Sequence, residues 1–241
     1  MQRVHALLHK ALKQAVNDGF VVRNVTQAVK APRQSRKEIP TLNREQARVF
    51  LEAAKVDRLE VLYLLAIHTG LRQGELLGLK WGDVDLDRGT LQVQRILSAA
   101  KNGPTFTTPK TNKGRSVRLT AQAVQALRDH RKRQVEERLK HDGFWQDHGL
   151  VFTTLVGTPL NRHNVVSRSF KPLLRRAGLP DIPFHALRHS FATLMLVGGE
   201  HPKVVQEMMG HSGIRVTMDF YSHVLPDMHQ GAADRLGVTL S

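Results

Sequence analysis

Residues Leu59–Ile67 are almost wholly apolar, and the pair Thr69-Gly70 follows them closely. A helix that is apolar on every side must be surrounded by other elements, because no face of it suits water. We therefore expect a central buried helix that Thr69-Gly70 ends. The next segment, Leu71–Trp81, begins a second helix with Arg72 at its very start. Leucines would hold this helix against the core, so that the arginine can reach into a cleft.

Helical patterns flank this core on both sides. Residues 1–18 place apolar side chains at helical spacing, and Gly19 stands where a helix would end. Asn43 and Gln46 have the form of a capping box for the first helix of a second unit, which begins near Thr41. Further helices are expected from Thr120 to about Lys140, from Asn161 to Ala177, and in the segment that follows His185.

Between residues 90 and 119 the pattern changes to short runs of β-forming residues, namely Leu91–Ile96, Phe106–Thr108 and Ser116–Leu119. A turn that contains Asn and Gly, residues 109–115, separates the last two runs. We predict a small antiparallel sheet with lysines at a hairpin tip, and a further short strand at Leu150–Thr153. The fold class is therefore mainly α-helical with a small antiparallel β-sheet (α+β).

The charge balance narrows the function. Lysine and arginine number 36 against 21 aspartate and glutamate, so the formal net charge is +15, which points to a polyanionic partner such as DNA. No apolar run approaches the roughly 20 residues that span a bilayer, so we expect a cytoplasmic protein without a membrane partner. The absence of cysteine excludes disulfides, thiolate catalysis and cysteine-ligated zinc.

The stretch from His185 to Tyr221 concentrates residues that suit phosphate chemistry. On a helix, His185, Arg188 and His189 would line one side of one turn. Phosphate oxygens favour the planar, permanently charged guanidinium fork with imidazole donors beside it. Tyr221 lies ten residues after His211 and supplies a candidate nucleophile. A strand of DNA is the natural acceptor for such a cluster.

In order and context, six residues of this chain resemble the catalytic residues of tyrosine recombinases, and in particular of the phage and conjugative-transposon integrases. They are Arg72 in Gly-Leu-Arg-x-Gly-Glu, Lys110 in Pro-Lys-Thr, His185 and Arg188 in His-x-x-Arg-His, His211 in Gly-His-Ser, and Tyr221. The resemblance covers about residues 41 to 225. It implies the catalytic-domain fold of this family for residues 41–241, including a C-terminal tail. Residues 31–40 would be a linker, and residues 1–30 would be the last helix of a truncated core-binding domain.

The resemblance also implies a reaction. Tyr221 would attack a DNA phosphodiester and form a 3′-phosphotyrosine, which keeps the bond energy, so neither a cofactor nor a metal is needed. The other roles are a phosphate clamp (Arg72 and Arg188), a hydrogen-bond donor (His211), a general acid for the 5′-oxygen (Lys110), a proton-transfer group (His185) and an orienting carboxylate (Glu75).

The expected partners also follow from the resemblance. They are double-stranded DNA, further copies of the chain in a homotetramer at a DNA synapse, and an accessory directionality or bending factor. The tail from Leu225 to Ser241 would form a short amphipathic helix that docks on a neighbouring copy. The protein would act at the bacterial nucleoid, where it integrates or excises a mobile element.

Parts of the pattern have a second interpretation. Lys110 is assigned from its Pro-Lys-Thr context alone, so Lys113 could take its place. His185 and His189 have the spacing of a metal pair, but a zincin needs glutamate after the first histidine, where Ala186 stands. Residues 186–211 also outline a helix-turn-helix, so the alternative function is a non-catalytic DNA-binding module. An inactive integrase remnant and a chromosome-resolving Xer-type recombinase are two further hypotheses that fit the same residues.

Overall fold

The computed structural model of the chain describes residues 2–29, 40–100, 103–108, 114–210, 213–214 and 217–218. The chain divides between residues 39 and 40 into two compact units. The first unit contains α1 (Gln2–Asn17) and the 3-10 helix η1 (Val25–Ala28). Asn24 caps η1, and its side-chain amide donates to the carbonyl of His9 at 2.9 Å, which ties the two helices together. The helix expected over residues 1–18 is confirmed, and its assignment to a core-binding domain stays a prediction.

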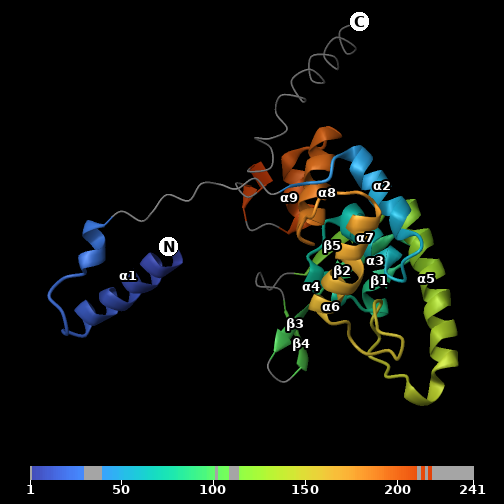
Figure 1. Ribbon diagram of the computed structural model, residues 1–241, viewed down its shortest axis with the longest axis horizontal. Helices are drawn as coiled ribbons and strands as arrows, with labels where there is room; N and C mark the ends of the chain where they lie inside the picture. The colour runs from blue at the N-terminus through green and yellow to red at the C-terminus, as the bar shows by residue number, and fades with distance from the viewer. Residues whose placement is uncertain are drawn as a thin grey trace, which may run out of the picture. The chain divides into compact units, whose positions relative to one another are not determined.

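Helix α3 (Glu60–Thr69) lies at the centre of the second unit, as Figure 1 shows. Every residue from Val61 to Ile67 is buried, so the predicted central helix is confirmed. It packs against α2 (Arg44–Ala54), α4 (Gln73–Leu77), α5 (Ala121–Lys140) and α8 (Ala186–Val197). Burying one large apolar side chain stabilises a fold by about 1.5–3 kcal/mol, so this helix anchors the unit.

Local hydrogen bonds explain where two of these helices begin. The side-chain oxygen of Asn43 accepts from the backbone N–H of Gln46 at 2.8 Å, and the side-chain oxygen of Gln46 accepts from the backbone N–H of Asn43 at 3.1 Å. This is the capping box predicted for α2. At the start of α5, the hydroxyl of Thr120 accepts from the backbone N–H of Ala123 at 3.2 Å.

Two antiparallel sheets form where one was predicted. The first has the order β1 (Val84–Asp85), β2 (Thr90–Val93) and β5 (Arg115–Arg118). The second is a hairpin of β3 (Ile96–Ala100) and β4 (Gly103–Thr107), and β3 contacts α4. Strand β4 thus pairs with β3, and β5 pairs with β2.

The predicted pairing of residues 106–108 with residues 116–119 is therefore wrong. Leu91 and Val117 are both buried and lie opposite each other in the first sheet. Thr105 and Phe106 of β4 are exposed. Two strands that each bury one face pair so that their buried side chains lie on the same side of the sheet. Strand β5 therefore pairs with β2, which is farther away in the sequence than β4, and β4 pairs with β3.

The strand predicted at Leu150–Thr153 is also wrong, since this segment forms only isolated bridges, from Leu150 to Lys80 and from Thr153 to Pro159. Instead, side chains of α5 form hydrogen bonds with backbone carbonyls of this segment. The amide of Gln134 donates to the carbonyl of Leu150 at 3.2 Å, and Nε2 of His130 lies 2.8 Å from the carbonyl of Val151. The 3-10 helix η3 (Asp142–Phe144) leads from α5 towards this segment.

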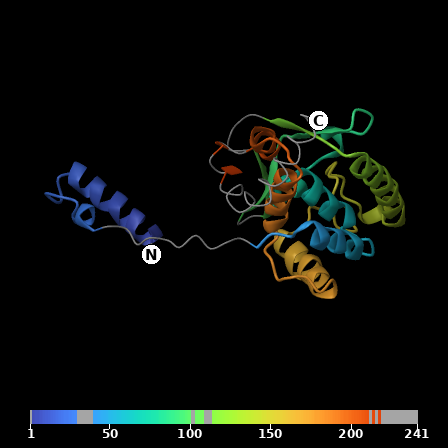
Figure 2. The ribbon, with the colours of Figure 1, turned by 90° about the horizontal axis from the view of Figure 1, so that it is seen from above.

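The remaining described helices lie between Arg162 and Met209. Asn161 caps a continuous helical stretch made of α6 (Arg162–Asn164), the π-helical η4 (Val165–Phe170) and α7 (Lys171–Arg176), which confirms the helix predicted from Asn161 to Ala177. Helix α9 (Pro202–Met209) packs against α8 after a turn in which Gly199 has a φ of +88°. Figure 2 shows that α5 and the α6–α7 stretch lie on different sides of the second unit.

Several expectations concern residues outside those described. They are the linker, Lys110, His211, Tyr221 and the C-terminal tail, and their predicted roles stay predictions. Within the described residues, no helix is long and apolar enough to cross a membrane.

Candidate active site

The site begins at the turn that ends α3. Gly70 has a φ of +62° there, and a Cβ at this position would lie 2.4 Å from the ring of Phe191 in α8, so only glycine fits. The close approach of α3 and α8 places the carbonyl of Gly70 2.6 Å from Nη1 of Arg188. Nη2 of Arg188 donates to the carbonyl of Met209 at 2.7 Å. Arg188, which is only 2% exposed, therefore joins the ends of α3 and α9.

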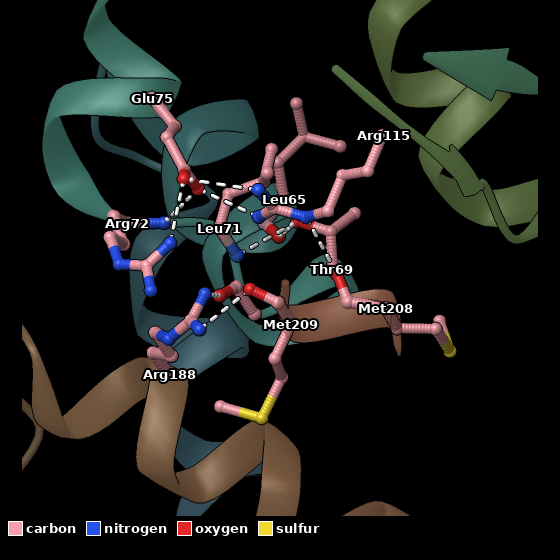
Figure 3. A network of polar contacts seen from close by, with 10 residues as sticks. Leu65, Thr69, Leu71, Arg72, Glu75, Arg115, Arg188, Met208 and Met209 are labelled. Atoms are coloured by element: carbon pink, nitrogen blue, oxygen red, sulfur yellow. Dashed lines mark hydrogen bonds and ion pairs between the residues drawn. The ribbon is translucent and has the colours of Figure 1, made fainter. Parts of the chain in front are cut away.

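A buried carboxylate holds two more arginines, as Figure 3 shows. Oε1 of Glu75 accepts from Nη1 of Arg72 at 2.9 Å and from Nη1 of Arg115 at 3.1 Å. Oε2 accepts from the backbone N–H of Arg72 at 2.9 Å and from Nη2 of Arg115 at 2.8 Å. A carboxylate has about four acceptor sites, so Glu75 is saturated and fixes both guanidinium groups. Arg72 is the N-cap of α4 and Glu75 belongs to its first turn, so the start of one short helix organises the pair.

Arg115 extends this network to the end of α9. Its Nε donates to the carbonyl of Met208 at 2.9 Å, next to the Met209 carbonyl that Arg188 holds. Gly210 follows with a φ of +64°, and a Cβ there would lie 2.9 Å from Cδ of Arg115. Arginines from β5 and α8 thus hold the last turn of α9, two residues before His211 in the chain.

The network carries more positive than negative charge. Burial by itself would raise the pKa of Glu75, but hydrogen bonds and charges from Arg115 and Arg72 outweigh it and hold that pKa below its usual value. Burial and the charge of Arg72 lower the pKa of Arg188 to about 9, which leaves it charged at neutral pH. Three guanidinium groups against one carboxylate leave a net charge of +2.

His185 stands at the entrance to α8. Its ring lies edge-to-face against that of His189 one turn later, with centroids 4.5 Å apart. Partial burial of the ring and the charges of Arg188, Arg72 and Arg162 lower the pKa of His185. Its imidazole is therefore neutral at neutral pH and can accept a proton. His189 is buried, and burial together with His185 and Arg188 lowers its pKa to about 4.

The structure brings together four of the predicted site residues, namely Arg72, Glu75, His185 and Arg188. The rings of His185 and His189 touch, and the charge of Arg188 acts on both histidines. The side chain of Arg188 turns inward to the backbone carbonyls of α3 and α9. The other three predicted residues, Lys110, His211 and Tyr221, lie outside the described residues.

Arg115 is a member of the network to which the sequence interpretation gave no role. The strand pattern carried a signal for it, because alternate residues of a strand share a face. Val117 is buried, so Arg115 two residues earlier faces the interior as well. An inward-facing arginine needs a carboxylate or carbonyl partner, and here it has both.

The arrangement can bind a tetrahedral oxyanion. The side chain of Glu75 is fully buried, whereas that of Arg72 is 41% exposed, so the carboxylate holds the guanidinium from behind. Among the described residues, Nε and Nη2 of Arg72 have no hydrogen-bond acceptor. Donors that are fixed before the reaction stabilise charge as it develops on a phosphate, because they need no reorganisation.

Known proteins resemble this chain in sequence. Residues 36–228 match the phage integrase family. A tyrosine recombinase XerC-like protein of Caldanaerobacter subterraneus subsp. tengcongensis is 37% identical over 92% of this chain and 61% of its own length. The ICEBs1 integrase of Bacillus subtilis (strain 168) is 29% identical over 95% of this chain and 62% of its own length. The chain thus spans about three fifths of the length of these relatives.

Solved structures share the fold. The Tn1549 transposon integrase in complex with transposon right end DNA has a TM-score of 0.80, at 24% identity, over 97% of this chain and 78% of that chain. XerA recombinase has a TM-score of 0.64, at 22% identity, over 91% of this chain and 79% of that chain. These matches confirm the predicted fold, mainly helical with small antiparallel sheets. Since the family match extends over more than half of its residues, the chain belongs to the phage integrase family of tyrosine recombinases.

Proposed function

We propose that this chain cleaves and rejoins DNA strands at specific sites through a 3′-phosphotyrosyl intermediate on Tyr221, and so integrates or excises a mobile element. The observation that carries the proposal is that the buried carboxylate of Glu75 fixes Arg72 and Arg115, with Arg188 held by backbone carbonyls at the same site. The surplus positive charge of these groups suits a phosphodiester, on which attack gathers further negative charge. The mobile-element integrases among the relatives support the same function.

The proposed roles follow the chemistry of each group. Arg72 and Arg188 hold the non-bridging oxygens, and His211 donates a further hydrogen bond. The hydroxyl of Tyr221 attacks phosphorus and gives its proton to the ring of His185. The bond from phosphorus to the 5′-oxygen breaks, and Lys110 protonates the departing oxygen. A 5′-hydroxyl of a second strand then reverses these steps, so the reaction needs no external energy source and no metal.

Glu75 does not react in this proposal. All of its acceptor sites are used by Arg72 and Arg115, so it sets the direction of the arginines. A purely DNA-binding module is not favoured, because it has no use for a nucleophilic tyrosine and because the relatives are named as recombinases and integrases. The proposed partners are double-stranded DNA, three further copies of the chain at a synapse and an accessory directionality or bending factor, at the nucleoid in the cytoplasm. Relatives solved with DNA support the first of these.

Substitution of Tyr221 by phenylalanine tests the proposal without knowledge of the target site. Supercoiled plasmid is incubated with the chain at low salt in the presence of a metal chelator, and the reaction is stopped with detergent. We expect the unmodified chain to relax the plasmid and to form a covalent protein–DNA adduct. Tyr221→Phe should abolish both and keep DNA binding, because only the nucleophile is lost.

The chain offers a matched control, since Tyr63 is its other tyrosine. Tyr63 is fully buried and hydrogen-bonded to Ser169, so Tyr63→Phe should retain the adduct if the protein folds. Relaxation that persists in Tyr221→Phe would refute the assigned nucleophile. Salt-dependent binding without any adduct from the unmodified chain would instead favour the binding module.

A further inference from the structure

Arg162 is an exposed arginine at the start of α6 that a buried side chain holds in place. Its Nε donates to the side-chain oxygen of Gln73 at 2.7 Å, and the side-chain nitrogen of Gln73 donates to the carbonyl of Arg162 at 3.2 Å. Because an arginine side chain has no acceptor, the oxygen of Gln73 must be the atom that faces it. The two hydrogen bonds are reciprocal, so they fix both the backbone and the guanidinium of Arg162.

Gln73 is placed where it can transmit the geometry of the active site. It is the first residue of α4, directly after Arg72, and it is 7% exposed. Buried polar side chains are normally satisfied within the core. Here both described hydrogen bonds of the amide go to one exposed arginine from a segment 89 residues away. The buried side chain of Gln73 thus positions the exposed guanidinium of Arg162. Gln73 is itself the neighbour in the chain of Arg72, which is predicted to clamp the phosphate.

The charge of Arg162 is available to a ligand. Among the described residues, neither of its Nη groups has a hydrogen-bond acceptor, and no carboxylate lies within ion-pair distance. Arg128 differs in this respect, because its guanidinium pairs with the carboxylate of Asp87 at 3.2 Å. Arg162 lies beside the active site, because its Nε bonds to Gln73, which directly follows Arg72 at the start of α4.

We propose that Arg162 contacts a DNA backbone phosphate beside the one held by Arg72 and Arg188, and that Gln73 is the residue that positions it. This inference rests on the proposed function, because it takes DNA as the ligand. Arg72 and Gln73 are consecutive, so one short helix would set the spacing of two phosphate contacts. A guanidinium that is already fixed loses less side-chain freedom on binding, and therefore binds more tightly than a mobile surface arginine.

A purely structural explanation is that the Gln73–Arg162 pair only ties α4 to α6. The two ideas differ in what Arg162→Ala would change. A structural tie predicts lower stability and unchanged sensitivity of DNA binding to salt. A phosphate contact predicts one fewer counterion released on binding, so the slope of log affinity against log salt should fall by about 1.

The test measures binding of the full chain to a short duplex of arbitrary sequence over a range of salt concentrations, with thermal unfolding of each variant alongside. Arg162→Ala should bind about tenfold more weakly at low salt, because a hydrogen bond to a charged group is lost, and its salt slope should fall. Gln73→Met keeps the charge of Arg162 and the approximate shape of the side chain at position 73, so it should weaken binding by less than Arg162→Ala does. The double variant should bind no more weakly than Arg162→Ala, because Gln73 acts through Arg162.

Two further variants keep the test decisive. Arg128→Ala removes from α5 a charge that is already paired with Asp87, in the turn between β1 and β2, and it should leave the salt slope unchanged. Arg162→Lys keeps the charge but cannot form the same fork with Gln73, so it should bind more weakly with nearly the original slope. If the salt slope of Arg162→Ala equals that of the unmodified chain, or if Gln73→Met binds as tightly as that chain, the inference is overturned. A flat salt response of the unmodified chain would instead overturn the proposed function.

Discussion

Replacing Arg188 by lysine is expected to slow strand cleavage about a hundredfold or more, almost as much as replacing it by alanine. Removal of one preorganised donor from an oxyanion site typically costs about a hundred- to a thousandfold in rate. Lysine keeps the charge, but it has no planar fork to span the carbonyls of Gly70 and Met209, which lie 2.6 and 2.7 Å from the two Nη atoms. The loss should therefore come from geometry rather than from charge.

The rate of covalent adduct formation in a single turnover measures this effect, with thermal unfolding as a check that Arg188→Lys is folded. Arg128→Lys is the matched control, because the exposed side chain of Arg128 on α5 pairs with Asp87 and takes no part in the network. DNA affinity should change little in both variants, since each substitution of arginine by lysine retains the positive charge at that position and the other cations are unchanged. A rate for Arg188→Lys within tenfold of the unmodified chain would show that charge alone is sufficient at this position.

Replacing Glu75 by glutamine is expected to destabilise the fold by about 3 kcal/mol, because removal of one partner from a buried ion pair leaves uncompensated charge. The carboxylate is fully buried and accepts four hydrogen bonds, and Arg72, Arg115 and Arg188 would lose their neutralising group. The partial exposure of Arg72 keeps the expected loss at the lower end of the usual range. The free energy of unfolding in urea measures it.

Acid should reproduce part of this loss. The pKa of Glu75 is lower in the folded protein than in the unfolded chain, so its contribution is complete above the ordinary glutamate pKa, about 4.3, and is lost as the pH falls through the folded value. Glu45→Gln is the matched control, since Glu45 pairs with Arg48 on the exposed face of α2 and should change stability by less than about 0.5 kcal/mol. Equal losses of stability in the two variants would mean that the buried network stabilises the fold no more than an exposed ion pair does.

The sequence predicted the elements of this fold better than their pairing. Helix α3 is apolar on every side, and a pattern of that kind has one solution, a position in the core. The strands are only two to five residues long, and each could pair with several others. What decides the pairing is which strand offers a buried face, as Leu91 does to Val117, and this depends on the folded core.

The candidate site shows the same division. Arg72, His185 and Arg188 could be identified because each stands in a short local motif at a helix start. The strand pattern indicates at most that Arg115 faces inward, and no local motif marks Arg162, since their partners Glu75 and Gln73 are 40 and 89 residues away in the chain. Only the packing of β5 and α6 around α4 brings these pairs together. Local sequence motifs therefore identify the residues that are proposed to react, whereas the residues that hold them in place are identified mainly from the fold.

Identification of the residue that becomes attached to DNA tests the central claim most directly. The covalent complex is trapped with detergent, digested with nuclease and protease, and analysed by mass spectrometry, while the ends of the cleaved DNA are tested for free 5′-hydroxyl groups. We predict a nucleotide remnant on the peptide that contains Tyr221, joined through a 3′-phosphate, with free 5′-hydroxyl ends. A remnant on any other residue, or a link through the 5′-phosphate, would contradict the proposed mechanism.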